Sequence, residues 1–117
     1  MKENLIMTKS FEFALLIIAL YKQLRSEGET VLSRQLLRSG TSIGANVFES
    51  EAAQSKADFI SKMSIASKEA RETKYWILLL KNSELTNINV DFILEKAESI
   101  VRILTSIVKT AKLGKQD

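Results

Sequence analysis

The stretch that decides the fold is Ser33–Trp76, with the sequence SRQLLRSGTSIGANVFESEAAQSKADFISKMSIASKEARETKYW. Apolar residues recur in it every three or four positions, which is the spacing of one face of an α-helix. Near its middle, Ser55 and Asp58 form a variant of the capping box, in which the serine caps a helix and the aspartate stabilises its positive end. The pattern predicts two helices, over residues 32–54 and 56–82, joined by a very short turn.

The composition of the whole chain favours the same class of structure. The chain has 117 residues with no proline and only four glycines, whereas strands and their turns depend heavily on these residues. A chain of this length is long enough to bury one hydrophobic core and too short for two. We therefore predict a single all-α domain over residues 1–117.

A third amphipathic segment precedes the central pair and is predicted as a helix over residues 9–26, capped by Thr8 or Ser10. Gly28 follows this segment and supplies a stop signal. Its apolar face consists of Phe13, Ile17, Leu20 and Leu24, and is widened by Phe11, Ala14, Leu15 and Ile18. We expect this wide face to pack against the neighbouring helices.

The last helix is predicted from its cap at Asn89 to the region of Leu113 and Gly114. Its core positions alternate steps of four and three, as in a coiled coil: Ile93, Ala97, Ile100, Leu104, Ile107 and Ala111. Four amphipathic helices with short connections pack most simply as an antiparallel up-down-up-down four-helix bundle, which is the predicted architecture.

Several residues of the central stretch are unusual for their positions. Gly40 and Gly44 lie in the middle of a helix, where each costs about 1 kcal/mol relative to alanine, so we predict close helix packing there. No strand precedes them and no lysine-serine pair follows, so a phosphate-binding loop is not indicated. Asn46 borders the core strip, and Lys62 and Glu69 fall between two apolar strips of their helix. We predict that these three polar residues are partly buried and that the two charges are paired.

A second apolar strip on the helix over residues 56–82 lies away from its core strip and consists of Ile65, Trp76 and Leu79. A helix of a small domain that is apolar on more than one side requires a second neighbour. We predict that this strip lies at or near a contact between subunits of a homo-oligomer.

The absence of histidine and cysteine excludes the common catalytic and metal-binding arrangements. Glu-x-x-His di-iron sites, Ser-His-Asp triads and Cys-His pairs all require one of these residues. The composition leaves a Ser-Lys pair or a carboxylate dyad open, but Ser64 with Lys68 and Ser67 with Arg71 at helical spacing are ordinary surface chemistry. We expect no enzyme activity, no metal or cofactor, and no small-molecule substrate. The apolar run Phe13–Leu20 covers about half of the ~20 residues that a membrane span needs, and no signal-peptide pattern is present. A cytoplasmic protein without a membrane partner is expected.

The formal net charge of +3 permits a nucleic-acid partner without requiring one. We predict phosphate contacts at two basic clusters: Arg34 and Arg38, and then Lys109, Lys112 and Lys115 near the end of the chain. Two alternatives remain open. Lysine near a helix C-terminus is expected from the helix dipole, and a charged strip is usually a solvated face. Arg38 also has an alternative partner in Glu69 or in a neighbouring subunit.

The run LSRQLLRSGTSIGANVFES over residues 32–50, followed by KADFISKMSIASKEARETKYW over residues 56–76, resembles the 23S rRNA intervening-sequence protein family. The similarity extends to EFAL in the first helix and ILTSIVKT in the last. Its core motif joins residues 36–39, residues 44–46 and residues 67–76, while residues 47–50 depart from the acidic or alanine-rich stretch common in the family. The resemblance implies an antiparallel four-helix bundle that assembles into a homopentameric ring.

The resemblance also bears on function. The family is similar in fold to the accessory protein of diversity-generating retroelements, which is basic and binds nucleic acid and a reverse transcriptase. This similarity favours a non-enzymatic, oligomeric module that binds RNA or DNA. The alternative is a structural or protein-interaction scaffold with no nucleic-acid role. Tyr75 and Trp76 are interpreted as packing residues, so no aromatic platform for single strands is predicted.

Overall fold

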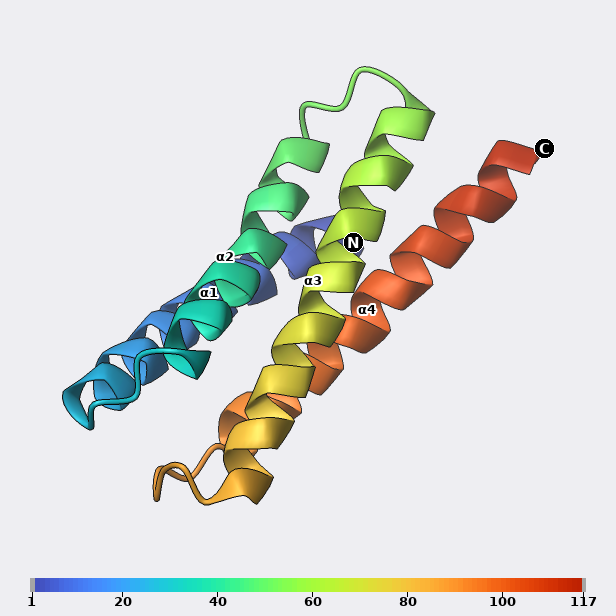
Figure 1. Ribbon diagram of the computed structural model, residues 1–117. Coiled ribbons are helices and arrows are strands. Elements are labelled where there is room, and N and C mark those ends of the chain that lie inside the picture. The colour runs from blue at the N-terminus through green and yellow to red at the C-terminus, as the bar shows by residue number, and fades with distance from the viewer. Residues whose placement is uncertain (1, 117) are drawn as a thin grey trace.

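The computed structural model describes the backbone of residues 2–116 and the side chains of residues 5–114. It contains four α-helices: α1 (Lys2–Ser26), α2 (Leu32–Ser50), α3 (Lys56–Ser83) and α4 (Asp91–Gln116). No strand occurs between residues 2 and 116. The chain turns back at each of the loops, so that successive helices lie side by side (Figure 1). The predicted all-α four-helix bundle is confirmed.

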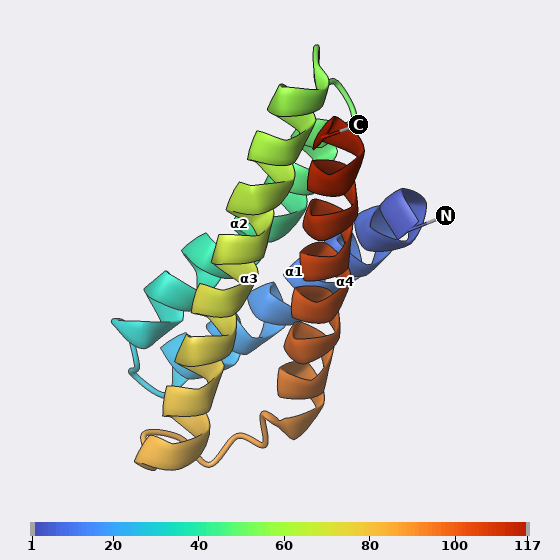
Figure 2. The same cartoon turned by 90° about the vertical axis from the view of Figure 1, so that its right-hand side faces the viewer.

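The helices contact one another in a closed order, α1 with α2, α2 with α3, α3 with α4, and α4 with α1. As a result, α1 lies diagonally opposite α3, and α2 lies diagonally opposite α4. The four helices are not all parallel to one axis: α1 crosses the bundle at an angle, and its N-terminal end extends beyond α4 (Figure 2).

One buried strip from each helix forms the core. The fully buried large side chains include Phe13 and Ile17 of α1, Leu36 and Ile43 of α2, Met63 and Ile77 of α3, and Ile100 and Leu104 of α4. The four-three seam predicted for α4 is buried from Ile93 to Ile107, and Ala111 at its end is half-buried.

Two helix boundaries differ from the predicted ones. The first helix begins at Lys2 instead of Lys9, and Ile6 in this added segment is fully buried in the core. The second helix ends at Ser50 instead of Gln54. The chain has to leave the helical conformation there because Ser55 adopts an extended backbone, with φ −154° and ψ 165°, to cap α3. The Ser55 hydroxyl accepts the Asp58 N–H at 3.0 Å, as predicted.

The cap of α2 is a feature that the sequence patterns did not reveal. Val31 occupies the N-cap position and makes no capping bond through its side chain. Instead, the Glu29 carboxylate accepts the backbone N–H groups of Val31 at 3.2 Å, Leu32 at 2.9 Å and Ser33 at 2.6 Å. Partial burial acts to raise the pKa of Glu29, but these three N–H groups outweigh it and hold the pKa below its usual value.

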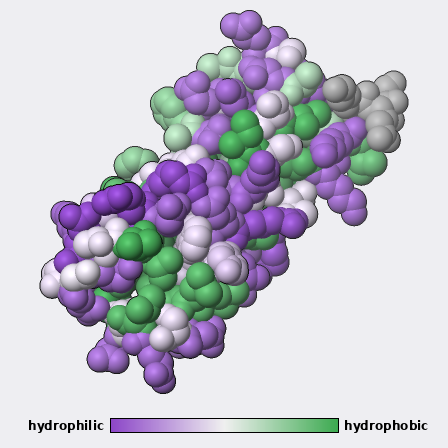
Figure 3. Space-filling model, in the orientation of Figure 1, coloured by the Kyte–Doolittle hydropathy of each residue, from purple (hydrophilic) through white to green (hydrophobic). Residues whose placement is uncertain are grey.

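The wide apolar face predicted for α1 is only partly buried, which corrects that expectation. Phe11 is 67% exposed, and Leu15 is also exposed. On the adjoining helix, Phe48 of α2 is 68% exposed. The tilt of α1 explains this outcome, because the bundle is too small to cover both sides of a helix that diverges from it. Figure 3 shows one face of the molecule, on which polar side chains are mixed with apolar patches.

Candidate nucleic-acid interface

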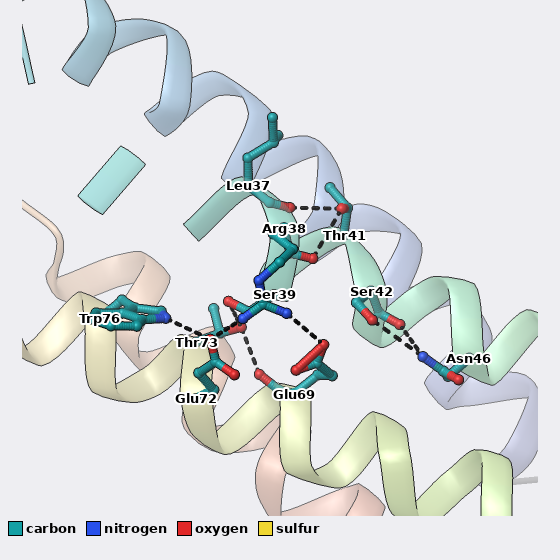
Figure 4. A network of polar contacts seen from close by, with 10 residues as sticks. All are labelled: Leu37, Arg38, Ser39, Thr41, Ser42, Asn46, Glu69, Glu72, Thr73 and Trp76. Carbon is teal, nitrogen blue, oxygen red and sulfur yellow. Dashed lines mark hydrogen bonds and ion pairs between the residues drawn. The ribbon is translucent and has the colours of Figure 1, made fainter. Parts of the chain in front are cut away.

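The α2–α3 seam contains a network of polar contacts centred on Arg38 (Figure 4). The Arg38 guanidinium donates to Glu69 Oε2 at 3.1 Å and forms a second ion pair with Glu72. Glu72 also accepts the Trp76 indole N–H at 3.0 Å. Arg38 is therefore paired with Glu69, the alternative to a phosphate contact that the sequence left open, and its charge is neutralised within the bundle.

The ionisation of this network follows from its contacts. Partial burial acts to raise the pKa of Glu72, but the hydrogen bonds from Trp76 and Arg38 and the Arg38 charge outweigh it, so the pKa is lowered. The hydrogen bond to Glu72, with the charges of Glu72 and Glu69, raises the pKa of Arg38. Arg38 and Glu72 therefore stay charged at neutral pH, and their ion pair joins α2 to α3.

Beneath the ion pairs lies a buried pair of hydroxyl groups. Thr73 Oγ1 lies 2.8 Å from Ser39 Oγ and 2.7 Å from the carbonyl oxygen of Glu69. On α2, the Asn46 amide donates to the Ser42 carbonyl oxygen at 2.9 Å. Asn46 is half-buried, and these bonds satisfy it within its own helix. The long motif in residues 36–46 and 67–76 thus builds the α2–α3 seam.

The predicted close packing of the two glycines occurs between α1 and α2. A Cβ atom on Gly40 would lie only 2.7 Å from Ile17 Cγ1, so no side chain fits without a shift of α1. Gly44 is less restricted, because its added Cβ would lie 3.4 Å from the Ser10 carbonyl oxygen. These contacts position the helices and hold no ligand.

The α3–α4 seam differs at its two ends. Toward the α3–α4 loop, ion pairs join Lys74 to Glu98 at 3.5 Å and Lys81 to Asp91 at 3.0 Å. At the other end, Lys56 Nζ of α3 lies 2.9 Å from the position of a Cβ on Gly114 of α4. These three proximities show the antiparallel register of the two helices at both ends of the seam.

The same register brings basic residues together beyond the ion pairs. One helical turn from the Lys74–Glu98 pair, this register sets the position of Arg71 in α3 opposite that of Arg102 in α4. Lys109 and Lys112 continue the row along α4. All four are exposed, and within residues 5–114 none of them forms an ion pair. We call this surface of Arg71, Arg102, Lys109 and Lys112 the basic seam.

The predicted basic clusters are not brought together. Arg34 is exposed on α2, diagonally across the bundle from α4, and Arg38 is committed to Glu69 and Glu72. The side chain of Lys115 lies outside the described residues. Arg71 belongs to the basic seam although the sequence patterns did not select it, because only the α3–α4 register shows which α3 residues face α4.

The residues predicted for a subunit contact differ in exposure. Ile65 is 40% exposed, whereas Trp76 and Leu79 are half-buried. Lys62 is also half-buried, and it has no ion-pair partner among the described side chains. A larger apolar surface lies on the opposite side of the bundle, where a groove of about 880 Å³ between α1 and α2 is lined by Phe11, Leu15, Val47 and Phe48 among others.

Two classes of site can be assessed directly. Over residues 5–114, no group of three or more acidic side chains is placed to hold a metal ion. In the part of the chain that the structure describes, no helix combines the length and the apolar character needed to cross a membrane.

The fold and the site define a small all-α bundle with a polar α2–α3 seam and a basic surface on α3 and α4. The sequence profile of the 23S rRNA-intervening sequence protein family matches residues 2–106, and the chain belongs to that family. This membership confirms the resemblance inferred from the motifs.

A solved structure supports the same relationship. It is the crystal structure of a protein of unknown function from the S23 ribosomal protein family of Bacteroides thetaiotaomicron. The two sequences are 50% identical over 93% of this chain and 99% of the other, and the TM-score is 0.87. A search of curated proteins gives no match. The descriptions of the family and of the solved structure name no enzymatic activity.

Proposed function

We propose that this protein is a non-enzymatic, oligomeric nucleic-acid-binding module of the cytoplasm, with RNA as its main ligand. The observation that carries the proposal is the basic seam, in which exposed cations from two helices lie in one row without carboxylate partners among the described side chains. Phosphate binding requires basic groups that are clustered in space and not already neutralised. The family's description, which names 23S rRNA, supports RNA over DNA.

The small number of cations in the basic seam predicts how strongly and how specifically the protein binds nucleic acid. Few basic residues per subunit give weak, largely sequence-independent binding that falls steeply with salt. Assembly into a ring would repeat the basic seam around an axis and raise the overall affinity through multivalency. The contribution of Arg34 is smaller, because it stands on a different side of the bundle with Arg38 already paired.

A closed ring needs two different contact surfaces on each subunit, one for each neighbour. The bundle carries two separate apolar surfaces: one formed by Phe11 of α1 and Phe48 of α2, and the α3 strip with Ile65, Trp76 and Leu79. These two surfaces are the subunit contacts in our proposal, and the pentamer implied by the resemblance is the expected assembly. Light scattering of the purified protein measures the mass of the assembly and so tests the expected number of subunits.

The experiment for nucleic-acid binding compares two double variants that each remove two positive charges. Lys109→Gln with Lys112→Gln alters the basic seam, whereas Lys22→Gln with Arg25→Gln alters exposed residues of α1. Fluorescence polarisation at low salt is measured with structured RNA, single-stranded RNA and duplex DNA. We expect the first variant alone to lose affinity, with both retaining the parental mass. Equal losses would place binding elsewhere.

The alternative function is a protein-interaction scaffold without a nucleic-acid role, and the exposed phenylalanines favour it. Phe11 and Phe48 border an apolar groove on the side opposite α3. The polarisation assay separates the two functions, because no binding of the intact oligomer to any probe would support the scaffold.

A further inference from the structure

We propose that the α3 surface beside the basic seam binds single-stranded nucleic acid, with Tyr75 as a stacking platform for a base. This inference rests on the proposed function and specifies its ligand as an unpaired strand. Tyr75 is 55% exposed, which corrects its interpretation as a packing residue. Exposed aromatic side chains next to basic residues are the usual means of holding single strands.

The position of Tyr75 relative to the cations supports this role. Arg71 precedes Tyr75 by one helical turn and Lys68 precedes it by two, so the three side chains share one outward strip of α3. Lys68 and Arg71 are exposed and have no ion pair with a described residue. Arg102 occupies the position opposite Arg71 across the α3–α4 seam. A strand whose base stacks on Tyr75 would therefore have its phosphates near Lys68, Arg71 and Arg102.

The Tyr75 ring is also held in place before a ligand arrives. Its centroid lies 5.3 Å from that of Trp76, with the two rings at 62° in an edge-to-face contact. Trp76 is fixed in turn by its bond to Glu72, which Arg38 orients. The α2–α3 network thus supports the aromatic platform from behind. A platform that is already oriented loses little conformational entropy on binding.

The charges around Tyr75 favour an anionic strand. The nearby carboxylates are ion-paired, Glu98 with Lys74 and Glu72 with Arg38, which also pairs with Glu69. The cations Lys68, Arg71 and Arg102, which form no ion pair among the described side chains, outnumber the one negative charge that this sharing leaves.

Within one subunit, no other helix packs over the outer side of α3 or α4 (Figures 1 and 2). The subunit contact proposed at Ile65, Trp76 and Leu79 borders Tyr75, and the inference requires that it leave the outer face of the Tyr75 ring open. A rigid duplex keeps its bases stacked and inaccessible to Tyr75, so it would meet the cations alone.

The test is Tyr75→Leu in the full chain, with Tyr75→Trp as the conservative variant. Phe92→Leu is the matched control, because Phe92 is an exposed aromatic with Lys96 Nζ 5.1 Å from its ring centroid, at a site outside this surface. Polarisation is measured with a short single-stranded RNA, single-stranded DNA of the same sequence, and the corresponding RNA duplex. Comparison of the first two probes shows whether the sugar contributes.

We expect Tyr75→Leu to weaken single-strand binding by roughly 5- to 50-fold, with a change of less than about twofold for the duplex. Tyr75→Trp and Phe92→Leu should bind as the parent does. Arg71→Gln should weaken both probes and reduce the salt slope by about 0.7–0.9. Light scattering and thermal melts accompany every variant, and Tyr75→Leu should leave both the mass and the melting temperature unchanged.

Several results would overturn the inference. If Tyr75→Leu changes single-strand and duplex binding alike, or changes neither, Tyr75 is not a base platform although the proposed function stands. If the variant loses oligomeric mass, Tyr75 is a subunit contact. If the parent binds none of the probes, the proposed function fails and this inference fails with it.

Discussion

The two seams of α3 differ in how their charged residues are used. Toward α2, Arg38 is bonded to Glu69 and Glu72, and the hydroxyls of Ser39 and Thr73 are buried beneath them. Toward α4, the ion pairs stop at Lys74–Glu98, and the cations beyond that point face solvent. The long motif that identifies the family thus maintains the fold and also contributes Lys68, Arg71 and Tyr75 to the proposed binding surface. The other cations of that surface, Arg102, Lys109 and Lys112, lie outside the motif.

Both seams depend on one apolar core, so the largest expected effect is Leu104→Ala. Leu104 is fully buried in the α4 strip, and truncation of such a side chain costs about 2–5 kcal/mol in the free energy of unfolding. Chemical denaturation measures the loss. Leu113→Ala, at an exposed position of the same helix, is the control and should change stability little. Equal melts for the two variants would contradict the assignment of the α4 strip.

The hydroxyl groups of the two seams give the next comparison. Thr73→Val removes the partner of the buried Ser39 hydroxyl, and an unsatisfied buried group costs about 1–3 kcal/mol. Thr105→Val, on exposed α4, removes only a bond to the carbonyl of Val101 in its own helix and should be nearly neutral. Adding Ser39→Ala to Thr73→Val should recover part of the loss. Additive effects in this double-mutant cycle would show that the two hydroxyls are not coupled.

The α2 cap should make the stability of the α2–α3 region depend on pH. The folded-state pKa of Glu29 is below its ordinary value of 4.5, so its contribution is complete above that pH and is lost as the pH falls through the lower folded value. Glu29→Gln should cost about 0.5–2 kcal/mol at neutral pH, as capping residues do. Denaturation across a pH series should show the difference from the parent shrinking in acid. A constant difference would indicate that the carboxylate charge plays no part.

Arg38→Gln should have a small effect on stability, because its ion pairs lie at the surface, where such pairs contribute about 0.2–1 kcal/mol. Lys74→Gln on the α4 side should cost less, since Lys74 has one carboxylate partner. Neither substitution removes a cation of the basic seam, so neither should weaken RNA binding as Lys109→Gln with Lys112→Gln does. A loss of affinity for Arg38→Gln as large as that for Lys109→Gln with Lys112→Gln would contradict the assignment of the phosphate contacts to the basic seam.

Much of the fold followed from local patterns. The spacing of apolar residues identified the four helices and the core strip of α4, because burial of one helix face requires residues three and four apart. Ser55 was recognised as a cap because its partner Asp58 is three residues away. The close approach at Gly40 followed from the cost of glycine in a helix, although the sequence could not name Ile17 as the neighbour.

Other features depended on contacts between residues distant in the chain. The sequence determined the helices, the absence of histidine and cysteine chemistry, and the two possible roles of Arg38. Only the packed bundle decided that Arg38 pairs with α3, that Arg71 and Arg102 occupy opposite positions of the α3–α4 seam, and that Tyr75 and Phe11 remain exposed. Helical periodicity gives the direction of a side chain around its own axis. What that side chain meets is set by the tilt and register of the neighbouring helices, which arise from the packing of the whole core.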